Sequence, residues 1–125
     1  MKKKNQINVL GGKLQICSKK PLTGFNRNGC CESTRGDIGR HFICTVVNNK
    51  FLEFQLVTGN DLITPKSEFD FPGLVEGDRW CVCADRWLSA YNYSCAAPVI
   101  LQSTNLDAIK IIDLKILKKF ALDLN

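Results

Sequence analysis

Residues 78–91 change periodicity at a single point, and this feature constrains the fold more than any other. In "DRWCVC" the side chains alternate, which in a strand places Trp80 and Val82 on one face. The other face then carries Arg79, Cys81 and Cys83. Directly afterwards, apolar residues recur at the i, i+3, i+4 and i+7 spacing of an amphipathic helix, at Ala84, Trp87, Leu88 and Tyr91. The segment therefore predicts a strand that leads without a linker into a helix.

The rest of the chain predicts short elements joined by loops. Residues 7–17 resemble a tight hairpin around two glycines, and the β-branched run at 40–47 resembles a buried strand. Residues 49–58 alternate as a strand would, but an Asn at the start and a Gly at the end favour a helix. Further strands are expected at 98–103 and 109–112, and a final helix follows Asp113. The predicted class is α+β, a single two-layer domain at 7–125 with a mixed sheet covered by helices, preceded by a basic, disordered tail at 1–6.

Composition favours a globular protein of the cytoplasm. Of 125 residues, 45% are hydrophobic and 23% are charged, which is typical of a folded domain. No run approaches the roughly 18 apolar residues of a membrane span, and no signal peptide is evident. The net charge of +5 lies largely in lysines near the two ends. We therefore expect neither nucleic acid nor a membrane as partner, while the actual partner and the oligomeric state stay open.

The seven cysteines are the unusual part of the composition. A cytoplasmic location keeps thiols reduced, and an odd count prevents complete pairing, so structural disulfides are not expected. Three roles remain open for these cysteines: metal ligands, reactive thiols, or small apolar residues of the core.

The predicted metal site consists of Cys30, Cys31, Cys81 and Cys83. Cys81 and Cys83 share a strand face with Cα atoms about 6.5–7 Å apart, at or beyond the upper limit for a disulfide between them. Both can ligate one ion, and the adjacent Cys30 and Cys31 lie in a loop that can turn toward them. Zinc is the possible cofactor, because it is held tetrahedrally by thiolates and imidazoles. The spacing matches no known zinc finger or ribbon.

Other polar residues are candidates for catalysis or for ligand binding. A thiol enzyme would use Cys83 or Cys30 as nucleophile and His41, the single histidine, as base. Arginine forks bind anions, and short carboxylates order turns. The predicted ligand-binding residues are accordingly Asp61, Asp78, Arg79 and Arg86, although a purely structural network would also explain them.

Several motifs together resemble one known family. The segments "NVLGGKLQICSKKPLTGFNRNGCC", "GNDLITP", "FPGLVEGDRWCVCADRW" and "AAPV" are similar to the bacterial domain-of-unknown-function family 2237, over roughly residues 7–115. The resemblance implies a compact mixed α/β fold and implies no activity. The preferred hypothesis is therefore a non-catalytic, cysteine-lined site for a metal ion or small ligand. The alternative is a thiol-dependent enzyme or redox protein, and whether the protein is an enzyme stays open.

Overall fold

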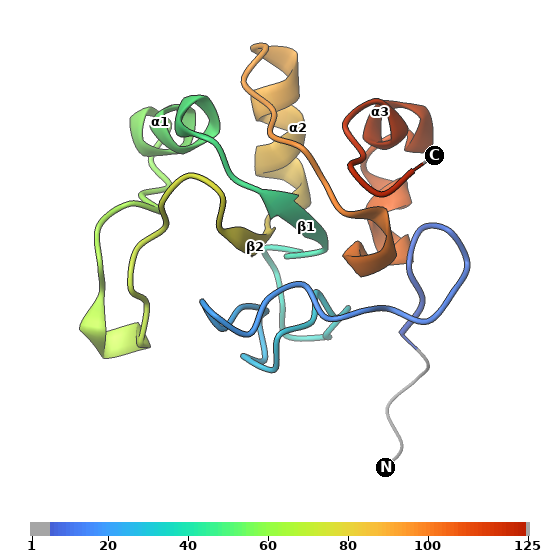
Figure 1. The fold of residues 1–125 in the computed structure, drawn as a ribbon, viewed down its shortest axis with the longest axis horizontal. Helices are drawn as coiled ribbons and strands as arrows, with labels where there is room; N and C mark the ends of the chain where they lie inside the picture. Colours follow the sequence, from blue (N-terminus) through green and yellow to red (C-terminus); the bar gives the residue numbers. More distant parts are fainter. Residues whose placement is uncertain (1–5, 125) are drawn as a thin grey trace.

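A computed structural model describes residues 6–124, and within them the fold consists of a two-stranded sheet, three α-helices and three short 3₁₀ helices (Figure 1). This confirms the α+β class. In chain order the elements are β1 (Ile43–Val46), α1 (Asn49–Val57), η1 (Ser67–Phe69), β2 (Arg79–Val82), α2 (Ala84–Asn92), η2 (Leu101–Ser103), η3 (Leu106–Lys110) and α3 (Leu114–Lys119).

The sheet is antiparallel, where the sequence predicts a mixed sheet. β1 pairs with β2 so that Cys44 lies directly opposite Cys81. The amides of these two residues point away from each other, toward the hydroxyls of Thr104 (3.2 Å) and Thr23 (2.9 Å). The two cysteines therefore form a non-hydrogen-bonded pair, the kind in which opposite side chains are closest.

The strand expected at 98–103 is reduced to two isolated β-bridges at Val99, one with Thr45 on the outer edge of β1 and one with Ala121. The prediction of a full strand is wrong, because η2 begins at Leu101. The carboxylate of Asp123 accepts the amides of Leu101 (2.8 Å) and Gln102 (2.9 Å), which turns the chain into a 3₁₀ helix. The strand expected at 109–112 is also wrong, since its first two residues belong to η3 and the last two form a turn and a bend.

The helices begin where side chains cap them. Asn48 caps α1 by accepting the amide of Phe51, and Asp113 caps α3 by accepting the amide of Lys115. Asn49–Val57 thus form the predicted helix, Thr58 is its C-cap residue, and Gly59 follows with a φ of +95°. α2 starts at Ala84 with Cys83 as its N-cap residue, which confirms the predicted strand-to-helix junction.

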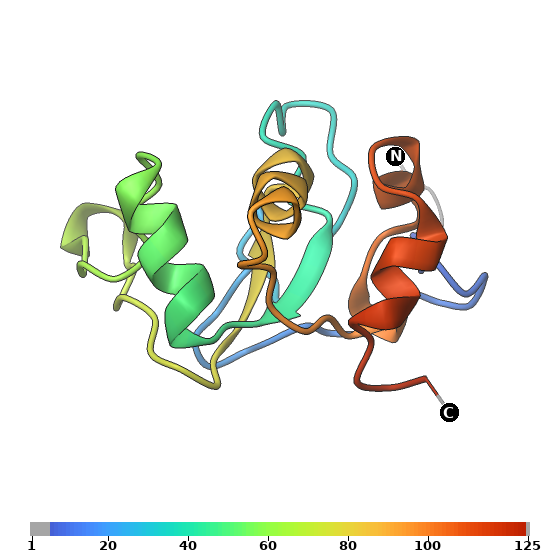
Figure 2. The same ribbon diagram turned by 90° about the horizontal axis from the view of Figure 1, so that it is seen from above.

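The three α-helices lie side by side on one side of the sheet (Figures 1 and 2). The core between them and the sheet centres on Trp87, which is fully buried. Its ring packs edge-on against Phe120 at 5.3 Å, and its indole N–H donates to the carbonyl of Ala97 at 3.1 Å. This core fixes α2, and with it the end of β2, where the candidate site residues lie.

Residues 6–40 cover the opposite side of the sheet without forming a named helix or strand (Figure 1). The hairpin expected at 7–17 is reduced to a tight turn closed by one bridge, between Ile7 and Lys13. Gln6 hydrogen-bonds to Ser33 and Asn105, so the packed region includes residue 6. The remainder of the predicted tail, 1–5, lies outside the described residues.

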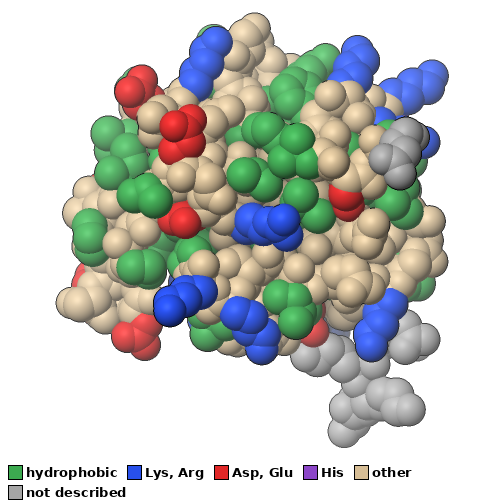
Figure 3. Space-filling view, viewed as in Figure 1, with side chains coloured by type: hydrophobic (Ala, Val, Ile, Leu, Met, Phe, Trp, Pro, Cys, Tyr) green, Lys and Arg blue, Asp and Glu red, His purple; other side chains and the backbone are tan. Residues whose placement is uncertain are grey.

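Basic side chains are distributed separately over the face viewed in Figure 3, between apolar and uncharged ones. None of the helices within residues 6–124 combines the length and the apolar character needed to cross a membrane.

Candidate functional site

Two disulfides join four of the cysteines, so the expectation that disulfides are absent is wrong. Cys17 is bonded to Cys44, and Cys31 to Cys81, with Cα separations of 5.6 Å and 5.3 Å. The expectation relied on compartment and an odd count, neither of which says which cysteines the fold brings together. Each bridge ties the N-terminal loops to one strand of the sheet.

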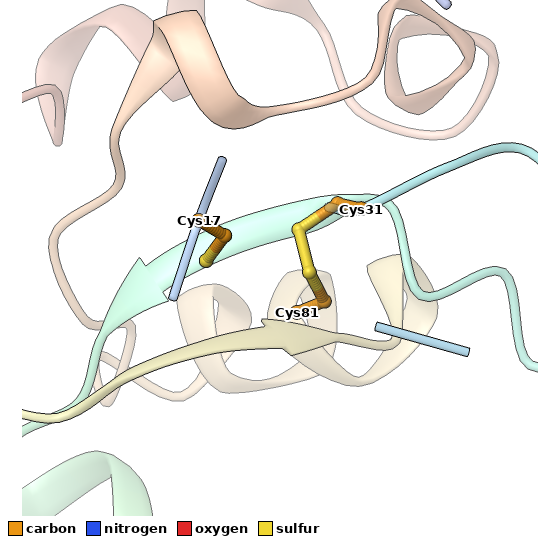
Figure 4. A group of neighbouring side chains, drawn as sticks. All are labelled: Cys17, Cys31 and Cys81. Carbon is orange, nitrogen blue, oxygen red and sulfur yellow. A yellow bond between two sulfur atoms is a disulfide. The ribbon is translucent and has the colours of Figure 1, made fainter. Parts of the chain in front are cut away.

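The sulfurs of the two disulfides form one cluster. The Sγ atoms of Cys17, Cys31 and Cys81 all lie within 4.8 Å of one another, and Cys44 is bonded to the first of them (Figure 4). The four cysteines are at most 3% exposed, and apolar side chains of Ile100 and Val46 surround them. We call these four residues the sulfur cluster. It contains Cys31 and Cys81 of the predicted metal set, together with Cys17 and Cys44, which the sequence did not single out.

The other two members of the predicted metal set lie elsewhere. Cys83 is the N-cap residue of α2 and is half-buried, next to a small hollow described below. Cys30 contributes to a separate hollow that is lined mainly by residues 6–14.

A hollow with aromatic walls lies beside β2 and has a volume of about 480 Å³. We call it the Trp80 pocket. Two loops and the strand supply its aromatic residues, and Phe71 packs edge-on against Trp80 at 5.2 Å. Charged or ionisable side chains and Cys81 also line it. The aromatic residues are Phe25, Phe69, Phe71 and Trp80, and the charged or ionisable ones are Arg27, His41, Asp61 and Lys66.

Arg27 lies over the ring of Trp80, with its guanidinium carbon 5.3 Å from the ring centroid. Its Nη1 donates to the carbonyl of Gly24 at 2.7 Å. Gly24 is required here, because it has a φ of +96° and a Cβ would lie 2.4 Å from the carbonyl oxygen of Cys30. Within the described residues no carboxylate pairs with Arg27, so its charge faces the pocket with aromatic and backbone partners alone.

His41 is held by a buried carboxylate. Its Nδ1 lies 2.6 Å from Oδ1 of Asp37, whose other oxygen accepts the amide of His41. The Asp37 side chain is fully buried, whereas the imidazole is 39% exposed. Gly39 leaves room for the ring, because a Cβ at that position would lie 2.6 Å from its Cε1. The arrangement orients the imidazole and leaves Nε2 for a further partner.

Asp61 is the one predicted ligand-binding residue in the Trp80 pocket. Hydrogen bonds from the side chain and amide of Thr64, and from the amide of Ile63, lower the pKa of Asp61 to about 2. The carboxylate is therefore ionised at neutral pH, and Lys66 lies 3.9 Å from it. Its geometry is that of a turn-ordering side chain with an ion-pair partner.

A smaller hollow of about 140 Å³ adjoins the Trp80 pocket and shares His41, Leu62, Trp80 and Cys81 with it. We call it the Cys83 pocket. Cys83 and Arg86 also line it, and Arg86 donates to the carbonyl of Thr58 at 3.3 Å. The fold thus brings His41 and Cys83, two predicted catalytic candidates, to the same hollow.

The remaining predicted ligand-binding residues lie apart from both pockets. Asp78 accepts the amide of Val75 and orders the turn before β2. Arg79 is exposed and lines a different hollow together with Asp123. Asp37, Arg27 and the pocket aromatics were not predicted from the sequence. The position of Asp37, four residues before the single histidine, was a signal that could have identified it. The aromatic residues come from loops that meet only in the fold, so no local sequence pattern identifies them.

Fold and site together define a small, disulfide-linked α+β domain with an aromatic, charged pocket beside its sheet. The model of the family described as "Uncharacterized protein conserved in bacteria (DUF2237)" matches residues 7–121. The chain belongs to this family. No curated protein matches the sequence.

Proposed function

We propose that the protein is a non-catalytic binding protein for a small organic anion with a flat, apolar body, held in the Trp80 pocket. The observation that supports this most is Arg27, a cation placed on an aromatic ring in a hollow of about 480 Å³ without a carboxylate partner among the described residues. Pockets for small molecules combine apolar walls with a few polar groups that fix the ligand's orientation.

The charges of the pocket favour an anion over a cation. Asp61 is ionised but lies close to Lys66, and Asp37 is buried behind His41. Arg27 is left to pair with an incoming carboxylate or phosphate, which an arginine fork binds well. The aromatic walls provide the faces on which a ring packs, with Trp80 and Phe71 already fixed against each other.

Binding is tested with the fluorescent aromatic sulfonate 8-anilinonaphthalene-1-sulfonate and with phenyl phosphate as competitor. We expect saturable binding of one dye per chain, displaced by phenyl phosphate and not by benzyl alcohol. The variant Arg27→Gln should weaken binding about tenfold or more, as expected for the loss of a charged hydrogen bond. Arg79→Gln, which alters an exposed arginine outside the pocket, is the matched control. Equal affinity of the two variants would contradict the proposal.

A thiol-dependent enzyme is the second candidate, and the Cys83 pocket is the observation that favours it. A nucleophile, a base and a group that orients the base are the parts such a site requires. Cys83, His41 and Asp37 fill these roles by residue type, and the first two line one hollow. Cys83 is also the N-cap residue of the nine-residue helix α2, whose buried Trp87 fixes the position of this junction.

Iodoacetamide labelling separates this second candidate from a binding protein. If Cys83 is a nucleophile, its alkylation at neutral pH is faster than that of Cys95, the half-buried thiol beyond α2. His41→Gln should then slow the alkylation of Cys83 and leave Cys95 unchanged. Equal rates for the two thiols would remove the nucleophile from the enzyme hypothesis.

A further inference from the structure

The two disulfides of the sulfur cluster lie next to each other. Two disulfides that serve only to stabilise the fold do not need to be neighbours. The Sγ atoms of Cys17, Cys31 and Cys81 lie within 4.8 Å of one another, and the Sγ of Cys44 is bonded to that of Cys17. Two of the four cysteines come from loops and two from the strands. In a tetrahedral zinc site with Zn–S bonds of about 2.3 Å, neighbouring sulfurs lie about 3.8 Å apart. Three of the four sulfurs therefore already lie near the spacing of a thiolate metal centre, and opening the Cys17–Cys44 bond supplies the fourth thiol beside them.

The backbone around the four cysteines is held independently of the disulfides. The amide of Cys17 donates to the carbonyl of Gly29 at 2.7 Å, which joins the two loops that carry Cys17 and Cys31. The carbonyl of Cys31 accepts a hydrogen bond from Asn105 at 3.1 Å. Cys44 and Cys81 are paired across the sheet and bonded to buried threonine hydroxyls. Opening the bridges thus leaves four thiols in a prearranged, dry site.

We infer that the reduced protein binds one zinc ion through Cys17, Cys31, Cys44 and Cys81. Each disulfide takes up two electrons and two protons from a dithiol reductant, which is itself oxidised to a disulfide. Two dithiols reduce both bridges, and zinc then displaces the four thiol protons. The cluster is in this view a redox-dependent metal site: two disulfides under oxidising conditions, and a zinc thiolate centre where dithiols keep cysteines reduced, as in the expected cytoplasmic location.

This inference differs from the ligand set expected from the sequence, and it does not depend on the Trp80 pocket. Cys83 is replaced by Cys44, which lies directly across the sheet from Cys81. Cys30 is replaced by Cys17. The two sets share Cys31 and Cys81, so variants at Cys17, Cys44 and Cys83 distinguish them.

The test uses the full chain, reduced with a phosphine and titrated with Co²⁺ as a spectroscopic substitute for zinc. We expect one Co²⁺ per chain, with the intense visible bands of tetrahedral cobalt and thiolate charge transfer, displaced by Zn²⁺. The oxidised protein should bind none. Cys17→Ser and Cys44→Ser should lose the four-thiolate spectrum, while Cys83→Ser and Cys95→Ser keep it. An unchanged spectrum in Cys17→Ser, or its loss in Cys83→Ser, would overturn the assignment.

A measurement on the unmodified sequence keeps the inference testable if a cysteine variant fails to fold. The reduced protein is alkylated with and without Zn²⁺, and the labelled positions are mapped by mass spectrometry. Zinc should protect Cys17, Cys31, Cys44 and Cys81 together, and leave the labelling of Cys83 and Cys95 unchanged. No protection, or protection centred on Cys83, would contradict the inference.

Discussion

Asp61, which lines the Trp80 pocket, has a pKa that its neighbours in the loop lower. Hydrogen bonds from Thr64 and Ile63 hold its pKa at about 2, below the ordinary value of about 4. A depressed pKa means that the ionised carboxylate stabilises the fold above about pH 4, and that this contribution disappears as the pH falls through about 2.

Asp61→Asn is therefore expected to lower the free energy of unfolding at pH 7, and to lower it progressively less as the pH falls toward 2. Urea unfolding at several pH values measures this difference. Asp70→Asn, a change in the same loop at an exposed position, serves as control. A difference between the wild type and Asp61→Asn that is constant across this pH range would contradict the assignment.

Gly39 is a second residue with a specific local role, because it leaves space for the imidazole of His41. Gly39→Ala should displace the ring from Asp37 and destabilise the fold by about 1–3 kcal/mol, as overpacking typically does. Gly36→Ala is the matched control, since a Cβ there meets nothing closer than 4.0 Å. Urea unfolding of the two variants should differ; equal midpoints would show that the loop adapts without cost.

At the scale of elements, the buried hydroxyls of Thr23 and Thr104 accept backbone amides at the two outer edges of the β1–β2 sheet. Thr23 accepts the amide of Cys81, and its side chain is fully buried. Thr23→Val keeps the shape but leaves this amide without its partner, which should cost about 1–3 kcal/mol of stability. Thr58→Val, at an exposed hydroxyl, should cost less than about 0.5 kcal/mol. Chemical denaturation compares them, and a harmless Thr23→Val would contradict this role.

The elements predictable from the sequence are those whose periodicity is local. The junction from β2 to α2 followed from alternation through Val82 and helical spacing from Ala84 onward. The strand expected at 98–103 failed because Asp123, some twenty residues away, bonds the amides of Leu101 and Gln102. A contact between distant residues decided that segment, and no window of sequence contains both partners.

At the scale of the whole molecule, the disulfides connect residues 27 and 50 positions apart in the chain. Loop-closure entropy alone assigns them about 3.5 and about 4 kcal/mol of stabilisation, if each is taken separately. Reduction in the presence of a chelator should accordingly lower the free energy of unfolding by several kcal/mol. Urea unfolding with and without phosphine measures this, with Cys95→Ser as a control that retains both bridges. An unchanged midpoint would contradict a stabilising role.

The candidate site was predictable only in part, because it also depends on contacts between residues that are distant in the chain. Cys31, Cys81, Cys83, His41 and Asp61 were singled out from residue type, and the structure distributes them over the sulfur cluster and two adjoining pockets. Which cysteines pair depends on how the N-terminal loops cross the sheet, and spacing along the chain does not encode that crossing. The aromatic walls likewise arise from two loops that meet only in the fold.

The central claim is that the Trp80 pocket binds a flat organic anion, and the two indole N–H resonances of the ¹⁵N-labelled protein test it most directly. Trp80 lines the pocket, whereas Trp87 lies outside it with its indole N–H donated to the carbonyl of Ala97, so one tryptophan is the internal control for the other. Titration with phenyl phosphate should shift the Trp80 indole resonance saturably, leave that of Trp87 in place, and lose this effect in Arg27→Gln. A Trp80 resonance that does not move, or that moves equally in Arg27→Gln, would contradict the claim.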